Sequence, residues 1–108
     1  MASAYAVRAN AIQSIAVDLR RQLELASIGT PSDMMRSIDI GVEVVNKILY
    51  SFLVSQDLFD SVEQDLNSKY KALRPEPSEV ILVFSLLLNV VRKFEQAATV
   101  WVEKYSKK

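Results

Sequence analysis

The sequence predicts an all-α fold, a four-helix antiparallel bundle with no β-sheet, formed by a single domain over residues 1–108. Two observations support this. Apart from Gly41, the residues that most often interrupt helices occur in two clusters, Gly29 with Pro31 and Pro75 with Pro77. Between the clusters, apolar residues recur every three or four positions, the spacing of one helical face. We therefore expect helices near 3–28, 31–54, 56–73 and 77–106.

The helix near 3–28 is predicted from a single apolar stripe. Its members are Tyr5, Ala9, Ile12, Ala16, Leu19, Leu23 and Ala26. Because much of the stripe is alanine, we expect a neighbouring helix to come close to it. Gly29 follows at a position where glycine commonly caps the C-terminal end of a helix, so we expect it to end this one.

The helix near 31–54 is predicted from a start signal and a stripe. Thr30 can cap its N-terminus, Pro31 suits the first helical position, and Asp33 adds the negative charge that a first turn favours. The stripe that follows consists of Met35, Ile38, Val42, Val45, Leu49 and Phe52. In residues 38–44, apolar side chains occupy every second position and are β-branched, a pattern that favours a strand. The longer helical pattern and the start signal lead us to predict helix.

No Gly or Pro lies between the helix near 56–73 and the helix before it. A single helix over 31–73 is the alternative, but it would be about 64 Å long at 1.5 Å per residue, which is too long for a compact domain. Acidic residues also precede basic ones in 57–74, as a separate helix dipole favours. We therefore predict a corner near 54–56, with Ser55 as the cap and Val54 and Phe59 as a hydrophobic staple.

The helix near 77–106 begins at Pro77 and is the most apolar of the four. Its stripe consists of Val80, Phe84, Leu87, Val91, Phe94, Ala98, Trp101 and Tyr105. Its first half is apolar on nearly every side, so we expect this helix at the centre of the bundle. Three neighbouring helices cover one stripe and part of its flanks, and the remaining apolar surface suggests a partner chain.

Composition argues against several classes of function. The chain has no Cys and no His, which excludes disulfides, the usual zinc sites and catalysis that needs either residue. It also lacks a glycine-rich phosphate loop and a nucleophile elbow. We therefore expect that the protein is not an enzyme and binds no cofactor and no metal. An enzyme without His or Cys chemistry is our third hypothesis, after the two described below. The acidic group Asp57, Asp60, Glu63 and Asp65 could supply oxygen ligands, but its members do not share one face, so we interpret it as a solvated helix start.

The leading hypothesis is a small non-catalytic protein-interaction module: an adaptor, an assembly chaperone or an accessory subunit of a larger complex. It rests on surplus apolar helix surface combined with missing chemistry. The architecture is similar to that of such helical proteins, an analogy that assigns no residue roles. The candidate interface residues are Met34, Ile81, Leu88, Trp101, Val102 and Tyr105. We also expect self-association to a dimer or a higher oligomer, through the second or fourth helix.

The alternative hypothesis is a nucleic-acid-associated accessory protein that uses basic helix ends. Its candidate residues are Arg20, Arg21, Arg92, Lys93, Lys104, Lys107 and Lys108. The thirteen basic residues are balanced by thirteen acidic ones, which argues against a protein whose main task is to bind phosphates. Helical spacing also predicts ion pairs of Arg20 with Glu24, Arg92 with Glu95 and Lys107 with Glu103. This hypothesis therefore ranks second.

We expect a cytoplasmic protein with no membrane span. The most apolar window, residues 80–91, is too short to cross a bilayer. Residues 1–17 contain no acid, which is also a feature of organelle transit peptides, but they belong to the periodic pattern of the first helix.

Overall fold

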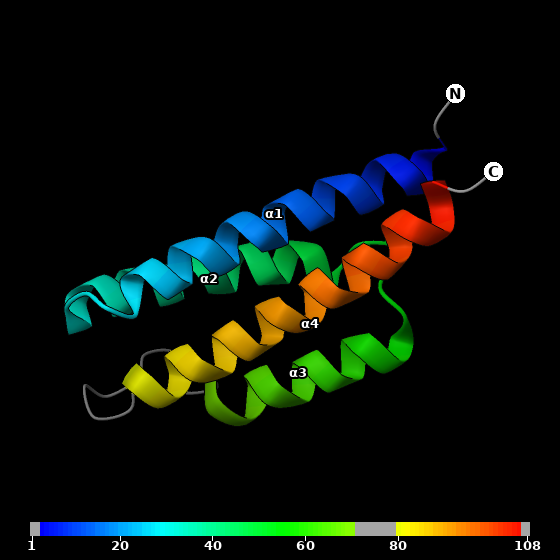
Figure 1. The fold of residues 1–108 in the computed structure, drawn as a ribbon. Coiled ribbons are helices and arrows are strands. Elements are labelled where there is room, and N and C mark those ends of the chain that lie inside the picture. Colours follow the sequence, from blue (N-terminus) through cyan, green and yellow to red (C-terminus); the bar gives the residue numbers. More distant parts are fainter. Residues whose placement is uncertain (1–2, 71–79, 107–108) are drawn as a thin grey trace.

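The computed structural model describes residues 3–70 and 80–106, with side chains described for 3–65 and 80–106. Within these ranges the chain forms α1 (Ala4–Ala26), α2 (Pro31–Leu49), α3 (Gln56–Tyr70) and α4 (Val80–Ser106), with no strand. Consecutive helices run in opposite directions (Figure 1), so the prediction of an all-α antiparallel bundle is confirmed. The predicted start of the last helix at Pro77 and the predicted end of the third at 73 lie outside the described residues.

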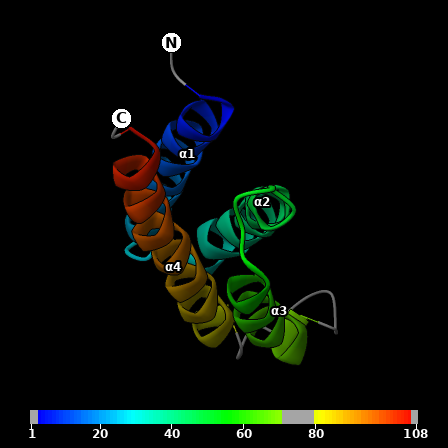
Figure 2. The same ribbon diagram turned by 90° about the vertical axis from the view of Figure 1, so that its right-hand side faces the viewer.

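The sequence predicts α4 at the centre of the bundle; in the structure it contacts all three other helices, but one of its faces stays exposed. It packs against α1, α2 and α3, whereas α2 and α3 barely touch each other (Figure 2). Its most extensive contact is with α1. Ala9 and Ala16 of α1 and Ala98 of α4 are completely buried, and such small side chains allow helix backbones to approach closely.

The core is built from the predicted apolar stripes. Its largest fully buried side chain is Phe94. The other buried residues that join the four helices include Ile12, Leu19, Leu23, Ile38, Val45, Leu49, Val62, Val83, Phe84, Leu87, Val90 and Val91. Most apolar residues in the first half of α4 are therefore covered by neighbours within the chain, while Ile81, Ser85, Asn89 and Arg92 form an exposed face. Only Ile81 and Leu82, in its first turn, remain clearly exposed among its large apolar residues before Val100.

The start of α2 is fixed by a reciprocal capping box. The backbone N–H of Asp33 donates to Oγ1 of Thr30 at 3.2 Å, and the backbone N–H of Thr30 donates to Oδ2 of Asp33 at 3.1 Å. Residues 38–44 lie within this helix, so the strand alternative is wrong. Ile38 and Val45 are buried while Ile40 is exposed, because burial here follows the helical period and not the alternation.

The end of α1 differs from the prediction that Gly29 caps it. The helix ends at Ala26, and Ser27 is the C-cap, its N–H donating to the carbonyl oxygens of Leu23 and Leu25. Gly29 has another role. A Cβ atom at this position would lie 2.7 Å from Oδ2 of Asp33, so the absent side chain leaves room for the Asp33 carboxylate to reach back to Thr30.

The corner between α2 and α3 begins five residues earlier than predicted, because α2 ends at Leu49 and not at 54. Ser51 organises it: its backbone N–H donates to Ile48, its carbonyl accepts from Val54, and its hydroxyl accepts from Leu53. Such local bonds of serine compete with the helical ladder. Ser55 then caps α3, as predicted, by accepting from the backbone N–H of Leu58 at 3.2 Å.

Candidate interaction surface

The six interface residues predicted from the sequence do not form one surface. Ile81 is 70% exposed, whereas Met34, Leu88 and Trp101 are half-buried against the core. Val102 and Tyr105 are half-buried near the other end of α4. Ile81 and Val102 are about 32 Å apart along this helix at 1.5 Å per residue.

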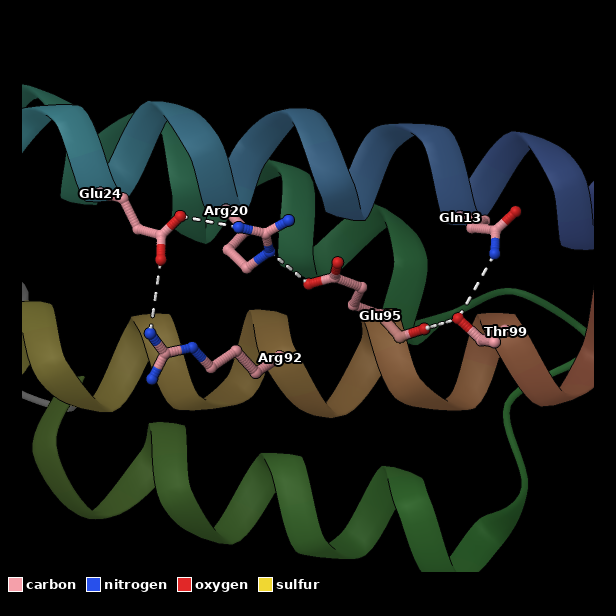
Figure 3. A network of polar contacts seen from close by, with 6 residues as sticks. All are labelled: Gln13, Arg20, Glu24, Arg92, Glu95 and Thr99. Atoms are coloured by element: carbon pink, nitrogen blue, oxygen red, sulfur yellow. Dashed lines mark hydrogen bonds and ion pairs between the residues drawn. The ribbon is translucent and has the colours of Figure 1, made fainter.

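Two of the predicted basic residues, Arg20 on α1 and Arg92 on α4, belong to a network of polar contacts that joins these helices (Figure 3). Nε of Arg20 lies 2.6 Å from Oε2 of Glu95, and its Nη1 lies 2.7 Å from Oε1 of Glu24. Nη2 of Arg92 lies 3.5 Å from Oε2 of Glu24. The predicted pair of Arg20 with Glu24 is confirmed. The predicted pair of Arg92 with Glu95 is wrong, because the packing of α4 on α1 brings each of these residues to a partner on the other helix.

The polar network also affects a pKa. The hydrogen bond to Glu95, and after it the charge of Glu95 and the contact with Glu24, raise the pKa of the Arg20 guanidinium above its ordinary value. Beside this network lies an open hollow of about 360 Å³, lined by Arg20, Arg92, Glu95, Gln96 and Thr99. Its lining carries two positive charges and one negative charge, and Glu24 of the adjoining network contacts both arginines, so the hollow offers little net attraction to a phosphate.

The remaining basic candidates are scattered. Nζ of Lys93 lies 2.6 Å from Oδ2 of Asp65, and Nζ of Lys104 lies over the ring of Tyr105, 5.3 Å from its centroid. Arg21 is exposed. Lys107 and Lys108, together with the predicted pair of Lys107 with Glu103, lie outside the described residues.

A groove that the sequence analysis did not identify runs along the outer side of α1. One hollow, of about 300 Å³, lies between α1 and α2 and is lined by Arg8, Ile12, Ile15, Val44, Lys47, Ile48 and Ser51. A second, of about 490 Å³, is lined by Ala4, Val7, Arg8, Ala11 and Phe52. Arg8 lines both hollows. We call this combined surface the α1–α2 groove.

Two of the exposed apolar side chains of the groove, Val7 and Ile15, lie off the stripes that predict the core, whereas Phe52 ends the predicted stripe of α2. Val7 is 60% exposed and Ile15 is 43% exposed, because the stripe of α1 faces its neighbours and leaves these two residues on the outer side. Phe52 is 58% exposed because α2 ends before it. The ring of Tyr5 holds it, with the two centroids 5.1 Å apart. Tyr5 also contacts the ring of Tyr105 at 5.2 Å.

The polar side chains at the groove are basic. Arg8 is exposed and makes no ion pair or hydrogen bond with any described residue. Lys47 has one acidic neighbour, Glu43, at 3.7 Å between Nζ and Oε1, and both side chains are largely exposed. Such a long, solvated contact contributes little. The groove therefore combines an apolar floor with two basic side chains that have little or no internal neutralisation.

Metal sites and membrane spans are both absent from the residues that the structure describes. No three His, Cys, Asp or Glu side chains gather there in a way that could hold a metal ion. In the predicted acidic group, Asp60 accepts a hydrogen bond from Gln56, and Asp65 accepts one from Lys93. None of the helices in this part of the chain is both long and apolar enough to cross a membrane.

Comparison of the chain with protein-family models, with curated protein sequences and with solved structures finds no match. A proposal for function therefore has to rest on the surface of the molecule itself.

Proposed function

We propose that this protein is a non-catalytic interaction module that binds a helical segment of a partner protein in the α1–α2 groove. It would serve in the cytoplasm as an adaptor, an assembly chaperone or an accessory subunit of a larger complex. The observation that carries the proposal is a concave surface with exposed Val7, Ile15 and Phe52. Apolar grooves between helices are common docking sites for an apolar helix face.

The groove has the features of a small binding site. Phe52 is an aromatic anchor whose position is already set by Tyr5, so little side-chain freedom is lost when a partner covers it. Fully burying an exposed Val, Ile or Phe contributes about 1.5–3 kcal/mol, and these side chains are already partly covered, so each adds about 1 kcal/mol. A groove of this size supports a transient complex more readily than an obligate one.

We further propose that the chain self-associates through the start of α4, where Ile81 and Leu82 are exposed side by side in the sequence. This surface is separate from the groove, which lies on α1, α2 and the corner after α2. Less apolar surface of α4 is available for self-association than the sequence suggests. The other large apolar residues of α4 up to Phe94 are covered at least in part by the core.

The nucleic-acid hypothesis gains no specific support from the packing. Arg20, Arg92 and Lys93 each contact an acidic residue, so their charges are partly neutralised before any phosphate arrives. None of the hollows described above combines Tyr, Lys and carboxylate side chains, the groups with which an enzyme that lacks His and Cys could work. We keep the interaction module as the leading proposal.

The test compares two matched variants during affinity capture from the protein's own cells. Ile15→Asp places a charge in the groove, and Ile40→Asp places the same charge on an isoleucine of similar exposure, 49%, that does not line it. We expect a partner that wild type and Ile40→Asp retain and Ile15→Asp loses. Capture of the same proteins by all three forms would contradict the proposal, as would capture of nucleic acid that is released steeply by salt.

A further inference from the structure

The charge of the α1–α2 groove indicates what kind of helix it accepts. We propose that the occupant is an amphipathic helix of another protein with acidic side chains beside its apolar stripe. The carboxylates would contact Arg8 and Lys47. This inference rests on the proposed function, since it requires that the groove binds a helix at all.

Arg8 is the central residue of this inference. It lines both hollows and therefore borders any occupant that fills the two together. Its guanidinium has no acidic partner among the described residues, although Arg20 on the same helix has two. A planar guanidinium pairs with a carboxylate through two parallel hydrogen bonds, which fixes orientation as well as charge.

Lys47 supplies the second positive charge, from the opposite wall of the first hollow. Its long contact with Glu43 is exposed to water, so an incoming carboxylate can replace it at little cost. Because Ile12, Ile15, Val44 and Ile48 lie in the same hollow, a partner would contact apolar and basic groups together. Both features match one face of an acidic amphipathic helix.

The length of the groove sets the length of the occupant. From Ala4 to Ile15 the wall formed by α1 extends for about 17 Å at 1.5 Å per residue, which is about three helical turns. A partner needs apolar residues spaced i, i+3 or i+4, and i+7 to follow it. Among the described residues of α4, the exposed large apolar side chains are Ile81, Leu82 and Val100, which do not form a stripe three turns long, so α4 of a second copy does not supply this occupant.

An anionic membrane surface offers the same sign of charge but the wrong shape. The apolar side chains of the groove line hollows between α1 and its neighbours, whereas a helix that lies on a bilayer presents a convex apolar face. Membrane binding is therefore treated as a competing outcome in the experiment.

The experiment uses three stapled helical peptides of three turns, each with the same leucine stripe and a fluorescent label. They differ only at two flanking positions, which carry Glu, Gln or Lys. Binding to the full chain is measured by fluorescence anisotropy at low and high salt. We expect the Glu peptide to bind about tenfold more tightly than the Lys peptide at low salt, with the preference fading at high salt. Amide shifts caused by the Glu peptide should centre on Arg8, Ile15 and Val44.

Charge reversal gives the decisive comparison. In Arg8→Glu/Lys47→Glu the preference should invert, so that the Lys peptide binds more tightly. Arg21→Glu/Arg36→Glu changes the net charge by the same amount at exposed positions that do not line the groove, and it should keep the wild-type preference. Circular dichroism checks that both double variants remain helical.

Three results would overturn the inference, and they differ in what they mean for the groove. If all three peptides bind equally and Ile15→Asp abolishes this binding, the groove remains a docking site and only the preference for an acidic partner is rejected. Absence of binding by the Glu peptide at millimolar concentration would also reject the inference. So would binding of phosphatidylserine vesicles that depends on Arg8 and Lys47 while the Glu peptide has no effect.

Discussion

A Cβ atom placed on Gly41 of α2 would lie 2.6 Å from Cδ2 of Leu87 on α4. Both residues are buried, and Leu87 is fully so. The glycine therefore sets how closely α2 approaches the central helix. In the sequence, Gly41 is a residue of low helix propensity inside a predicted helix. In the structure it packs against Leu87, and any side chain in its place would have to displace Leu87.

The first prediction concerns this contact. Gly41→Ala should lower the free energy of unfolding by about 1 kcal/mol, because overpacking costs about 1–3 kcal/mol and helix propensity returns about 1 kcal/mol. Urea denaturation measures the change. In a Leu87→Ala background the crowding is gone, so the same substitution should become neutral or stabilising. Stabilisation of the otherwise wild-type chain by Gly41→Ala would show that α2 and α4 do not meet here.

The second prediction concerns pH. Hydrogen bonds from Thr30, first of all from its backbone N–H, lower the pKa of the Asp33 carboxyl. A lowered folded-state pKa contributes stability that is present above the ordinary carboxyl pKa and is lost as pH falls through the folded value. Wild type should therefore exceed Asp33→Asn in urea midpoint near neutral pH, and the gap should close between about pH 5 and about pH 2.

Asp39→Asn is the matched control for this titration. Asp39 is exposed in the middle of the same helix and is no part of the capping box. Its substitution should produce no gap that closes with acid. A gap of equal pH dependence for both variants would mean that the capping box does not titrate. Thr30→Ala, which removes the other half of the box, should cost about 1 kcal/mol at neutral pH.

The third prediction concerns the polar network between α1 and α4. Arg20→Gln should lower the melting temperature, because it breaks the contacts with both Glu95 and Glu24. The loss should shrink in high salt, since the network is partly exposed and therefore screened. Arg21→Gln removes the same charge from the next, exposed position and should change little. Calorimetry of the three proteins at two salt concentrations checks this, and equal effects of both variants would contradict it.

The fourth prediction concerns self-association. Wild type at micromolar concentration should elute as a dimer or larger species in size exclusion with light scattering. Ile81→Glu should shift it towards the monomer, because a charge at an exposed apolar contact is costly to bury. Val100→Glu, at an exposed position near the other end of α4, should leave the oligomer intact. A wild-type chain that stays monomeric would show that this surface does not join copies of the protein.

The local signals of the sequence predicted helices well and some of their ends less well. Thr30, Pro31 and Asp33 identify the start of α2 because a cap is formed by residues that are adjacent in the chain. The ends of α1 and α2 were predicted less well. At each of these ends a serine before the predicted boundary, Ser27 or Ser51, takes part in local hydrogen bonds that compete with the helical ones. The spacing of apolar residues carries no information about such bonds.

The candidate site could not be predicted in the same way. Of the groove residues, Ile12 and Phe52 belong to the apolar stripes that the sequence marks, and it marks them as core. Val7 and Ile15 look like ordinary residues between stripes, and Phe52 looks like the end of a helix stripe. They become a surface because α2 stops at Leu49 and the corner that follows it places Phe52 against Tyr5 of α1.

The sequence by itself determined that the chain is helical, where the helices lie and which stripes form the core, because these follow from the spacing of neighbouring residues and from short-range hydrogen bonds. The tertiary structure decided which charges neutralise each other and which apolar residues stay exposed. Arg92 meets Glu24 instead of Glu95, and Arg8 meets no acid among the described residues, because pairing between helices depends on how the helices cross. That crossing is set by the packing of the whole core, including the contact of Gly41 with Leu87, and no local window of sequence contains it.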